Sequence, residues 1–70
     1  MPVVQVSVRE GRPPERLRKM ISAVTAAVAE SLDAPKESIR VIVTEVPFTH
    51  WATGDVTIQE KQGAPSGEVA

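Results

Sequence analysis

The sequence predicts an α/β (α+β) protein built from a small βαβ unit with parallel strands and a C-terminal β-hairpin. Residues 3–9 and 39–46 alternate apolar and other side chains and are rich in valine and isoleucine, which is typical of strands. Between them, the apolar residues of 15–32 recur every three or four positions, which is typical of an amphipathic helix. A strand, a helix and a second strand in this order favour a right-handed parallel crossover.

The first strand is expected over VVQVSVR, residues 3–9, with Val4, Val6 and Val8 on one face. Gly11 ends this strand. Pro14 fits the first turn of the next helix, because a proline there loses no hydrogen bond that the helix needs.

The helix is expected from Glu15 to Leu32, and Asp33-Ala34-Pro35 ends it. Alanines on its other faces permit close packing on a sheet. The apolar stripe consists of Leu17, Met20, Ile21, Val24, Val28 and Leu32.

The second strand is expected over IRVIVTEV, residues 39–46. Both of its faces are largely apolar, which favours a strand that is covered on two sides. Arg40 lies within this run, where an unpaired charge would be costly. It therefore requires either an ion-pair partner or a bound anion.

After Pro47, the stretch Thr53-Gly54-Asp55 and the short β-branched run that follows it predict a small hairpin. A two-stranded hairpin is not stable alone, so we expect this one to lie on the sheet edge of another subunit. The whole chain, residues 1–70, is expected to form a single domain, of which about 60–70 form a mobile tail.

The composition predicts a small protein that assembles with further subunits. The chain has 70 residues, and a domain of this size buries only about 60% of the surface that its unfolded chain exposes. It has no cysteine and only one histidine, so no disulfide and no metal site is expected. The net charge of −1 argues against nucleic-acid binding. No apolar run reaches the roughly 18 residues that span a membrane and no secretory signal is visible, so we expect a cytoplasmic protein.

Pro2 directly follows Met1, and a small residue there normally allows the methionine to be removed. A free terminal amine titrates at about 7.7–8.0, and apolar burial together with neighbouring guanidinium groups would lower the pKa of the Pro2 amine toward neutrality. Such an amine is an effective general base. The alternative is an ordinary proline at the start of an edge strand, and Pro2 alone favours it.

Three further residues are candidates for a binding site. The guanidinium of Arg12 could hold a carboxylate in a two-pronged contact, or it could be a solvated turn residue. Arg9 could enter the same pocket or lie on the surface. Trp51 is the single tryptophan, and it could anchor a subunit interface, form the apolar wall beside Pro2, or do both.

Taken together, these residues resemble the 4-oxalocrotonate tautomerase (2-hydroxymuconate tautomerase) family of the tautomerase superfamily. The resemblance runs without a gap from residue 2 to about residue 54. The elements that carry it are Pro2, EGR at 10–12, SLDAP at 31–35, IRVIVTEV at 39–46 and HW at 50–51.

The resemblance implies a tautomerase-like fold, assembled as a homohexamer that is a trimer of dimers, and an isomerase of aromatic-compound catabolism that needs no cofactor. It implies that Pro2 is the general base on a small unsaturated 2-hydroxy or 2-oxo carboxylic acid. Arg12 is then expected to bind the distal carboxylate, and Arg40, usually from a neighbouring subunit, the 2-oxo group and the nearby carboxylate. Trp51 is expected to line the apolar pocket.

Two departures from the family pattern leave alternatives open. Arg9 stands where the tautomerases typically have an apolar residue and where the related 3-chloroacrylate dehalogenases have an arginine. Those enzymes also need a glutamate that activates water, and this chain has Thr53 at that position. A threonine cannot act as that general base, so a dehalogenase or hydratase is the weaker alternative. Asp55 adds a charge near the pocket, so the preference between dicarboxylates and monocarboxylates stays open. A third alternative is a non-catalytic subunit of a mixed hexamer.

Overall fold

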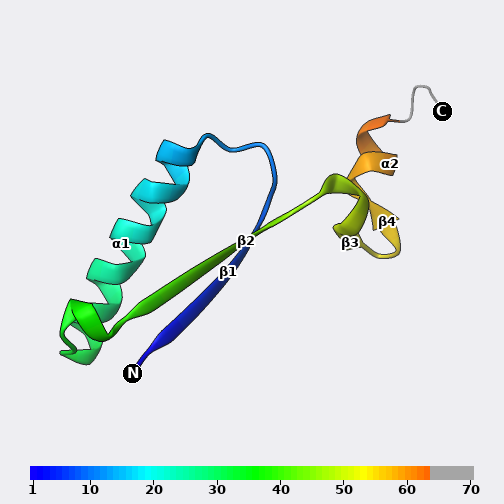
Figure 1. Cartoon of the computed structure of the whole chain (residues 1–70). Coiled ribbons are helices and arrows are strands. Elements are labelled where there is room, and N and C mark those ends of the chain that lie inside the picture. Colours follow the sequence, from blue (N-terminus) through cyan, green and yellow to red (C-terminus); the bar gives the residue numbers. More distant parts are fainter. Residues whose placement is uncertain (64–70) are drawn as a thin grey trace.

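The structure, a computed structural model, describes residues 1–63 of the chain. A parallel pair of strands lies beside one long helix, and a small C-terminal unit lies beyond the second strand (Figure 1). The elements are β1 (Val3–Arg9), α1 (Pro14–Leu32), the 3₁₀ helix η1 (Lys36–Ser38), β2 (Arg40–Val46), the 3₁₀ helix η2 (Phe48–His50), β3 (Ala52–Thr53), β4 (Val56–Thr57) and α2 (Ile58–Gly63).

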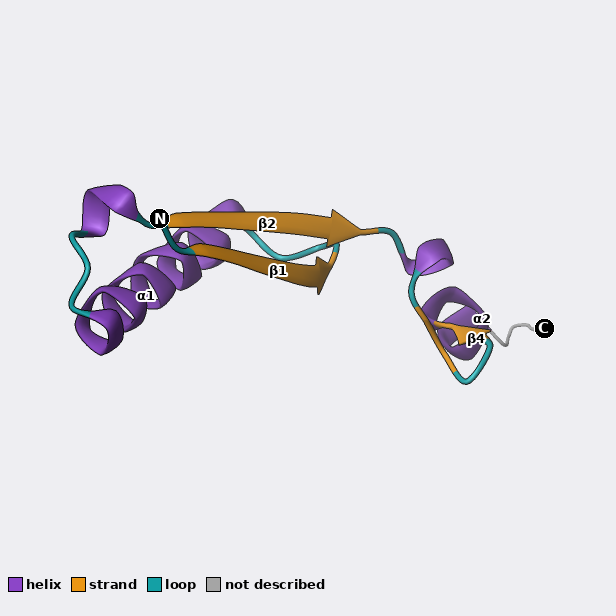
Figure 2. Cartoon of the chain, turned by 90° about the horizontal axis from the view of Figure 1, so that it is seen from below, coloured by secondary structure: helices purple, strands orange, loops and turns teal. Residues whose placement is uncertain are grey.

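β1 and β2 pair in parallel, which confirms the predicted βαβ unit. Val4 lies opposite Val41 and Val6 lies opposite Val43, so their side chains share one face. These four residues are half-buried, whereas most of those that alternate with them are exposed. α1 lies along this one face of the strands (Figure 2). The valines and the helix stripe therefore form the apolar layer of the βαβ unit.

The other face of the strand pair is open, although the sequence predicts a second strand that is covered on both sides. Val3 is 55% exposed and Ile42 is 47% exposed on this face. One helix can cover only one face of a sheet, so the apolar residues of the second face are left for another chain to cover.

The ends of α1 follow their local sequence, and the predicted helix is confirmed to within one residue. Pro14 occupies the first turn, where its missing N–H is not needed. Asp33 ends the helix in the left-handed region, with φ of 53°. Asparagine and aspartate tolerate this conformation better than most residues, because their short side chains bond locally.

The predicted hairpin is confirmed between β3 and β4. Gly54 and Asp55 both have positive φ, at 59° and 70°, which is the conformation of a two-residue turn between twisted strands.

Residues 58–63, at the start of the tail expected from about residue 60, form the short helix α2. The remainder, residues 64–70, lies outside the described residues. The backbone N–H of Thr57 donates to Glu60 Oε1 at 3.0 Å, and the N–H of Glu60 donates to Thr57 Oγ1 at 3.1 Å. This reciprocal capping box stabilises the first turn of a helix.

The described chain has almost no interior of its own. None of the hydrophobic side chains of residues 1–63 is fully buried. The radius of gyration is 16.5 Å, whereas a compact domain of this length has about 11 Å. The long dimension of 51 Å arises because the hairpin and α2 lie beyond the end of β2, away from α1 (Figures 1 and 2). Within residues 1–63, neither helix has the length and apolar character needed to cross a bilayer.

Because no hydrophobic side chain of residues 1–63 is fully buried, we expect folding and self-association to be coupled. The midpoint of thermal unfolding, followed by circular dichroism, should then rise with protein concentration. For a dimer, each tenfold increase in concentration stabilises the folded state by about 1.4 kcal/mol. A midpoint that stays constant over a wide concentration range, together with a monomer mass by sedimentation, would contradict this expectation.

Candidate functional site

Pro2 and Arg40 lie together at the amino-terminal end of the strand pair. The backbone N–H of Arg40 donates to the carbonyl of Pro2 at 3.0 Å, which extends the pairing of β1 and β2 by one step. The guanidinium of Arg40 lies beside the first residue, because its Nη1 donates to Met1 Sδ at 2.9 Å. Pro2 and the Arg40 guanidinium therefore lie at the same end of the strand pair.

Within the single chain, Arg40 is not enclosed by apolar residues. The sequence predicts that its charge needs a partner because it lies within an apolar strand. Its side chain is exposed instead, since it points to the open face of β2. Water can therefore solvate the guanidinium in the single chain, and no buried ion pair is required.

Arg9 and Arg12 lie at the opposite end of β1. Arg9 is its last residue, and Arg12 folds back so that its Nη1 donates to the carbonyl of Arg9 at 3.2 Å. The positive φ of Gly11, 111°, permits the sharp turn between the two arginines. Two guanidinium groups are thereby held at one end of the strand.

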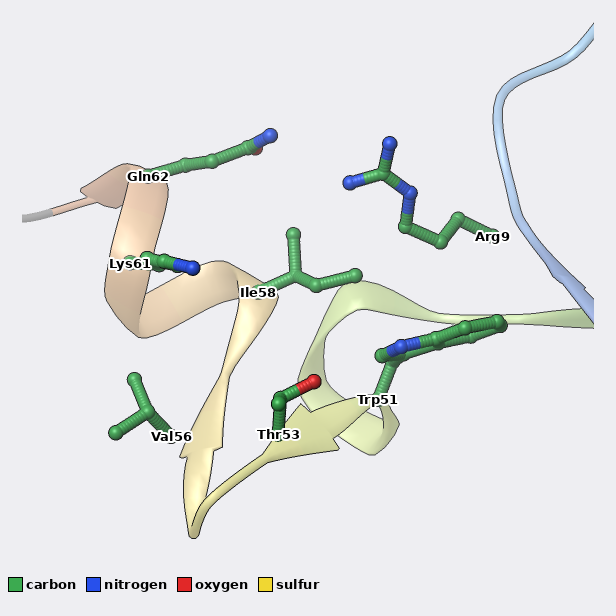
Figure 3. A pocket seen from close by; sticks show the side chains of 7 residues that line it. All are labelled: Arg9, Trp51, Thr53, Val56, Ile58, Lys61 and Gln62. Carbon is green, nitrogen blue, oxygen red and sulfur yellow. The ribbon is translucent and has the colours of Figure 1, made fainter.

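A cavity of about 330 Å³ lies between this strand end and α2. Figure 3 shows the Arg9 guanidinium reaching toward α2, with the Trp51 indole on the same side of the cavity. The backbone N–H of Ile58 donates to the carbonyl of Trp51 at 2.9 Å, which fixes the start of α2 beside the aromatic residue. The lining includes Arg9, Trp51, Thr53, Ile58, Lys61 and Gln62.

Arg12 lines a different cavity, of about 370 Å³, between the end of β1 and the first turns of α1. Arg16 is the second cation of this cavity, and Val8, Leu17 and Met20 supply apolar walls. The two arginines at the end of β1 therefore serve separate cavities within one chain.

The single chain does not bring all the predicted site residues together. Pro2 and Arg40 lie at one end of the strands, and Arg9, Arg12 and Trp51 lie at or beyond the other. At about 3.3 Å per residue, the length of β1 separates these two groups by about 20 Å. A six-carbon acid is much shorter than this distance. Any site that uses both groups must therefore combine two chains.

Sequence reasoning missed the contribution of α2 to the cavity beside Trp51. Ile58, Lys61 and Gln62 come from this helix, in a region where the sequence predicts the end of the hairpin and a tail. One signal was present in the stretch TIQE, residues 57–60. A threonine followed three residues later by a glutamate is typical of a helix start.

Comparison with known proteins gives a consistent result. The family model described as "Tautomerase enzyme" matches residues 2–61. A probable tautomerase of Ralstonia nicotianae is 45% identical over 56 residues, which cover 80% of each chain. The 2-hydroxymuconate tautomerase of Stutzerimonas stutzeri is 44% identical over 54 residues, which cover 77% of this chain and 86% of that protein.

A solved structure supports the same relationship at the level of the fold. It is that of a heterohexamer 4-oxalocrotonate tautomerase from Chloroflexus aurantiacus, which is 35% identical and has a TM-score of 0.82. The match covers 86% of this chain and 97% of that one. With the βαβ unit, the hairpin and these matches in agreement, the chain belongs to the 4-oxalocrotonate tautomerase family of tautomerase enzymes, which are isomerases.

Proposed function

We propose that this tautomerase interconverts 2-hydroxy-2,4-dienoates, such as 2-hydroxymuconate, with their 2-oxo forms, with Pro2 as the general base and without a cofactor. One observation supports the proposal: Pro2 is half-buried at the start of the strand pair, where the backbone N–H of Arg40 donates to its carbonyl at 3.0 Å. The name of the Stutzerimonas stutzeri relative supports the substrate class. Catabolism of aromatic compounds is the setting that produces such acids.

The mechanism requires the loss of Met1, because the nitrogen of Pro2 is otherwise an amide without a basic lone pair. Once free, the ring nitrogen carries the proton that the 2-hydroxyl group loses and that a carbon of the conjugated chain gains. Arg40 binds the 2-oxygen and the adjacent carboxylate, where negative charge develops. The carbonyl of the substrate is the electron sink, so the reaction balances without an external oxidant or reductant.

Two chains are needed for a complete site, and antiparallel pairing of two β1 edges would supply it. A twofold axis across these edges places the Pro2 end of one chain beside the Arg9 and Trp51 end of the other. In the same pairing, the apolar open faces of the two chains lie side by side. We propose that such dimers associate further into a homohexamer, in which Arg40 comes from the same or a neighbouring chain.

The alternatives have less support. Hydration or dehalogenation requires a carboxylate that activates water, and the hydroxyl of Thr53 stands on the cavity wall instead. A non-catalytic role in a mixed assembly is the second alternative, since the relative from Chloroflexus aurantiacus is a heterohexamer. This chain carries Pro2, Arg12 and Arg40 itself, so copies of it can complete their own sites.

Replacing the base is the first test. We expect intact-mass measurement of the purified protein to show the loss of Met1, and Pro2→Ala to lower the rate of 2-hydroxymuconate ketonisation by about 10²-fold or more. The ultraviolet absorbance of the dienol reports the rate. Pro35→Ala, at an exposed turn, is the matched control. Equal rates for Pro2→Ala and the wild type would remove proline as the base.

Arg40→Ala tests charge stabilisation at the same end of the strands. We expect kcat to fall by about 10²–10³-fold, because the guanidinium stabilises charge that develops in the transition state. The folded state should be retained, since the side chain is exposed. Arg18→Ala, at an exposed position of α1, controls for the loss of one cation. Loss of structure by circular dichroism in Arg40→Ala alone would indicate a structural role instead.

Mixing two inactive variants tests the two-chain site. Pro2→Ala and Arg12→Ala should each be nearly inactive, but a refolded equal mixture should regain about a quarter of the wild-type activity. In each mixed pair, one of the two sites receives an intact Pro2 and an intact Arg12 from different chains. A mixture that stays as inactive as its components would show that both residues act within one chain.

A further inference from the structure

The two flanks of α1 lie over different parts of the βαβ unit. Arg16 and Met20 line a cavity together with Val8 of β1, so this flank lies on the side of β1. Arg18 lines another cavity together with Lys36, so the opposite flank lies on the side of η1, which leads into β2. Because β1 pairs with β2 along one edge, the flank with Arg16 and Met20 lies toward the free edge of β1.

This free-edge flank continues along the helix. An α-helix has about 3.6 residues per turn, so Ala23, Ala27 and Glu30 follow Arg16 and Met20 along the same side of α1. Met20 is half-buried, and the other four residues are exposed. A cation therefore lies near one end of the free-edge flank, an anion lies near the other end, and two small side chains lie between them.

Arg16 and Glu30 are too far apart to pair within one chain. The helix rises about 1.5 Å per residue, so the two residues lie about 21 Å apart along α1. An ion pair requires a nitrogen–oxygen distance of about 4 Å or less. Two copies of the helix that run in opposite directions would place each charge beside its opposite.

The twofold axis proposed for the β1 edges also brings two helices together. Neighbouring strands lie about 4.8 Å apart, and pairing of two β1 edges gives four strands, of which each helix covers two. The helix axes are then about 10 Å apart, which is the upper end of the range for packed helices. Ala23 and Ala27 permit this approach, and the flexible side chain of Met20 can fill the remaining space.

The same axis sets the register of the two helices. Val6 is the middle residue of β1 and Ala23 is the middle residue of α1, and the two elements run in opposite directions (Figure 1). An axis through the middle of one therefore passes near the middle of the other. Arg16 lies about two turns before Ala23 and Glu30 lies about two turns after it, so the axis places these two residues opposite each other in different chains.

We propose that the free-edge flank is a self-recognition surface, on which two α1 helices pack antiparallel and Arg16 of each chain pairs with Glu30 of the partner subunit. The symmetry forms this ion pair twice. The inference rests on the twofold axis of the proposed function. Two such pairs favour a copy of the same chain over a related chain that lacks one of the charges. This selection determines whether the assembly is uniform or mixed, and the relative from Chloroflexus aurantiacus is a heterohexamer.

Charge reversal in the full chain tests the surface. We expect Arg16→Glu and Glu30→Arg each to raise the dissociation constant of the dimer by about tenfold or more, because like charges then meet twice across the axis. Sedimentation measures this constant. An equal mixture of the two variants should regain the wild-type value, because both contacts of a mixed pair again join opposite charges. Native mass spectrometry should show mixed pairs well above the roughly one half that random pairing gives.

The double variant Arg16→Glu/Glu30→Arg tests selection directly. We expect it to associate with itself as tightly as the wild type does, and to form mixed pairs with the wild type at well below about one half. Arg18→Glu is the matched control, because it makes the same charge change on the opposite flank of α1. Its dissociation constant should equal that of the wild type. If a single variant does not fold alone, circular dichroism of the mixture reports the same rescue.

A mixture that associates as weakly as its components, mixed pairs at the random ratio, or an equal loss in Arg18→Glu would overturn the self-recognition surface. These measurements need no substrate, so they are separate from the test of the reaction. Association that depends on both charges, in a protein that does not ketonise 2-hydroxymuconate, would retain the surface and reject the proposed reaction. Ketonisation by a protein whose assembly is insensitive to both charges would do the reverse.

Discussion

The hydrogen-bonded pairing of β1 with β2 decides which chemistry-bearing residues lie together. The two strands run parallel and in register over their whole length, from Val3 opposite Arg40 to Arg9 opposite Val46. This pairing fixes Arg40 beside Pro2 and keeps both away from the opposite end of the strands. The length of the strand pair therefore separates Pro2 and Arg40 from the two arginines at the other end of β1.

The same arrangement leaves an apolar face of the strand pair exposed in the single chain. One helix covers one face of two strands, and the residues that remain exposed on the other face include Val3 and Ile42. A second chain that covers this surface, or pairs with a free strand edge, is what the proposed two-chain site requires. The small buried surface of residues 1–63 and the separation of the candidate site residues both follow from a strand pair that a single helix covers on one face.

The C-terminal unit depends on contacts that are local in the sequence. The positive φ angles of Gly54 and Asp55 close the hairpin, and the hydrogen bond from Ile58 to Trp51 returns the chain to the aromatic residue. The capping box of Thr57 and Glu60 then starts α2. These contacts surround the Trp51 cavity with side chains from one short segment, and among the described residues the βαβ unit adds Arg9 alone to its lining. The binding surface can thus vary with the C-terminal sequence while the strand pair stays the same.

The sequence by itself determined the βαβ unit, the hairpin, the family and the identity of Pro2, Arg9, Arg12, Arg40 and Trp51 as candidates. Alternation, helical periodicity and turn residues are local properties, so they can be read from neighbouring positions. Only the tertiary structure decided that Arg40 is exposed, that Arg9 and Arg12 line different cavities, and that Lys61 joins Arg9. These facts depend on which face of a strand is turned to solvent and on which segments, distant in the sequence, lie together. The spacing of residues along one element determines neither of these.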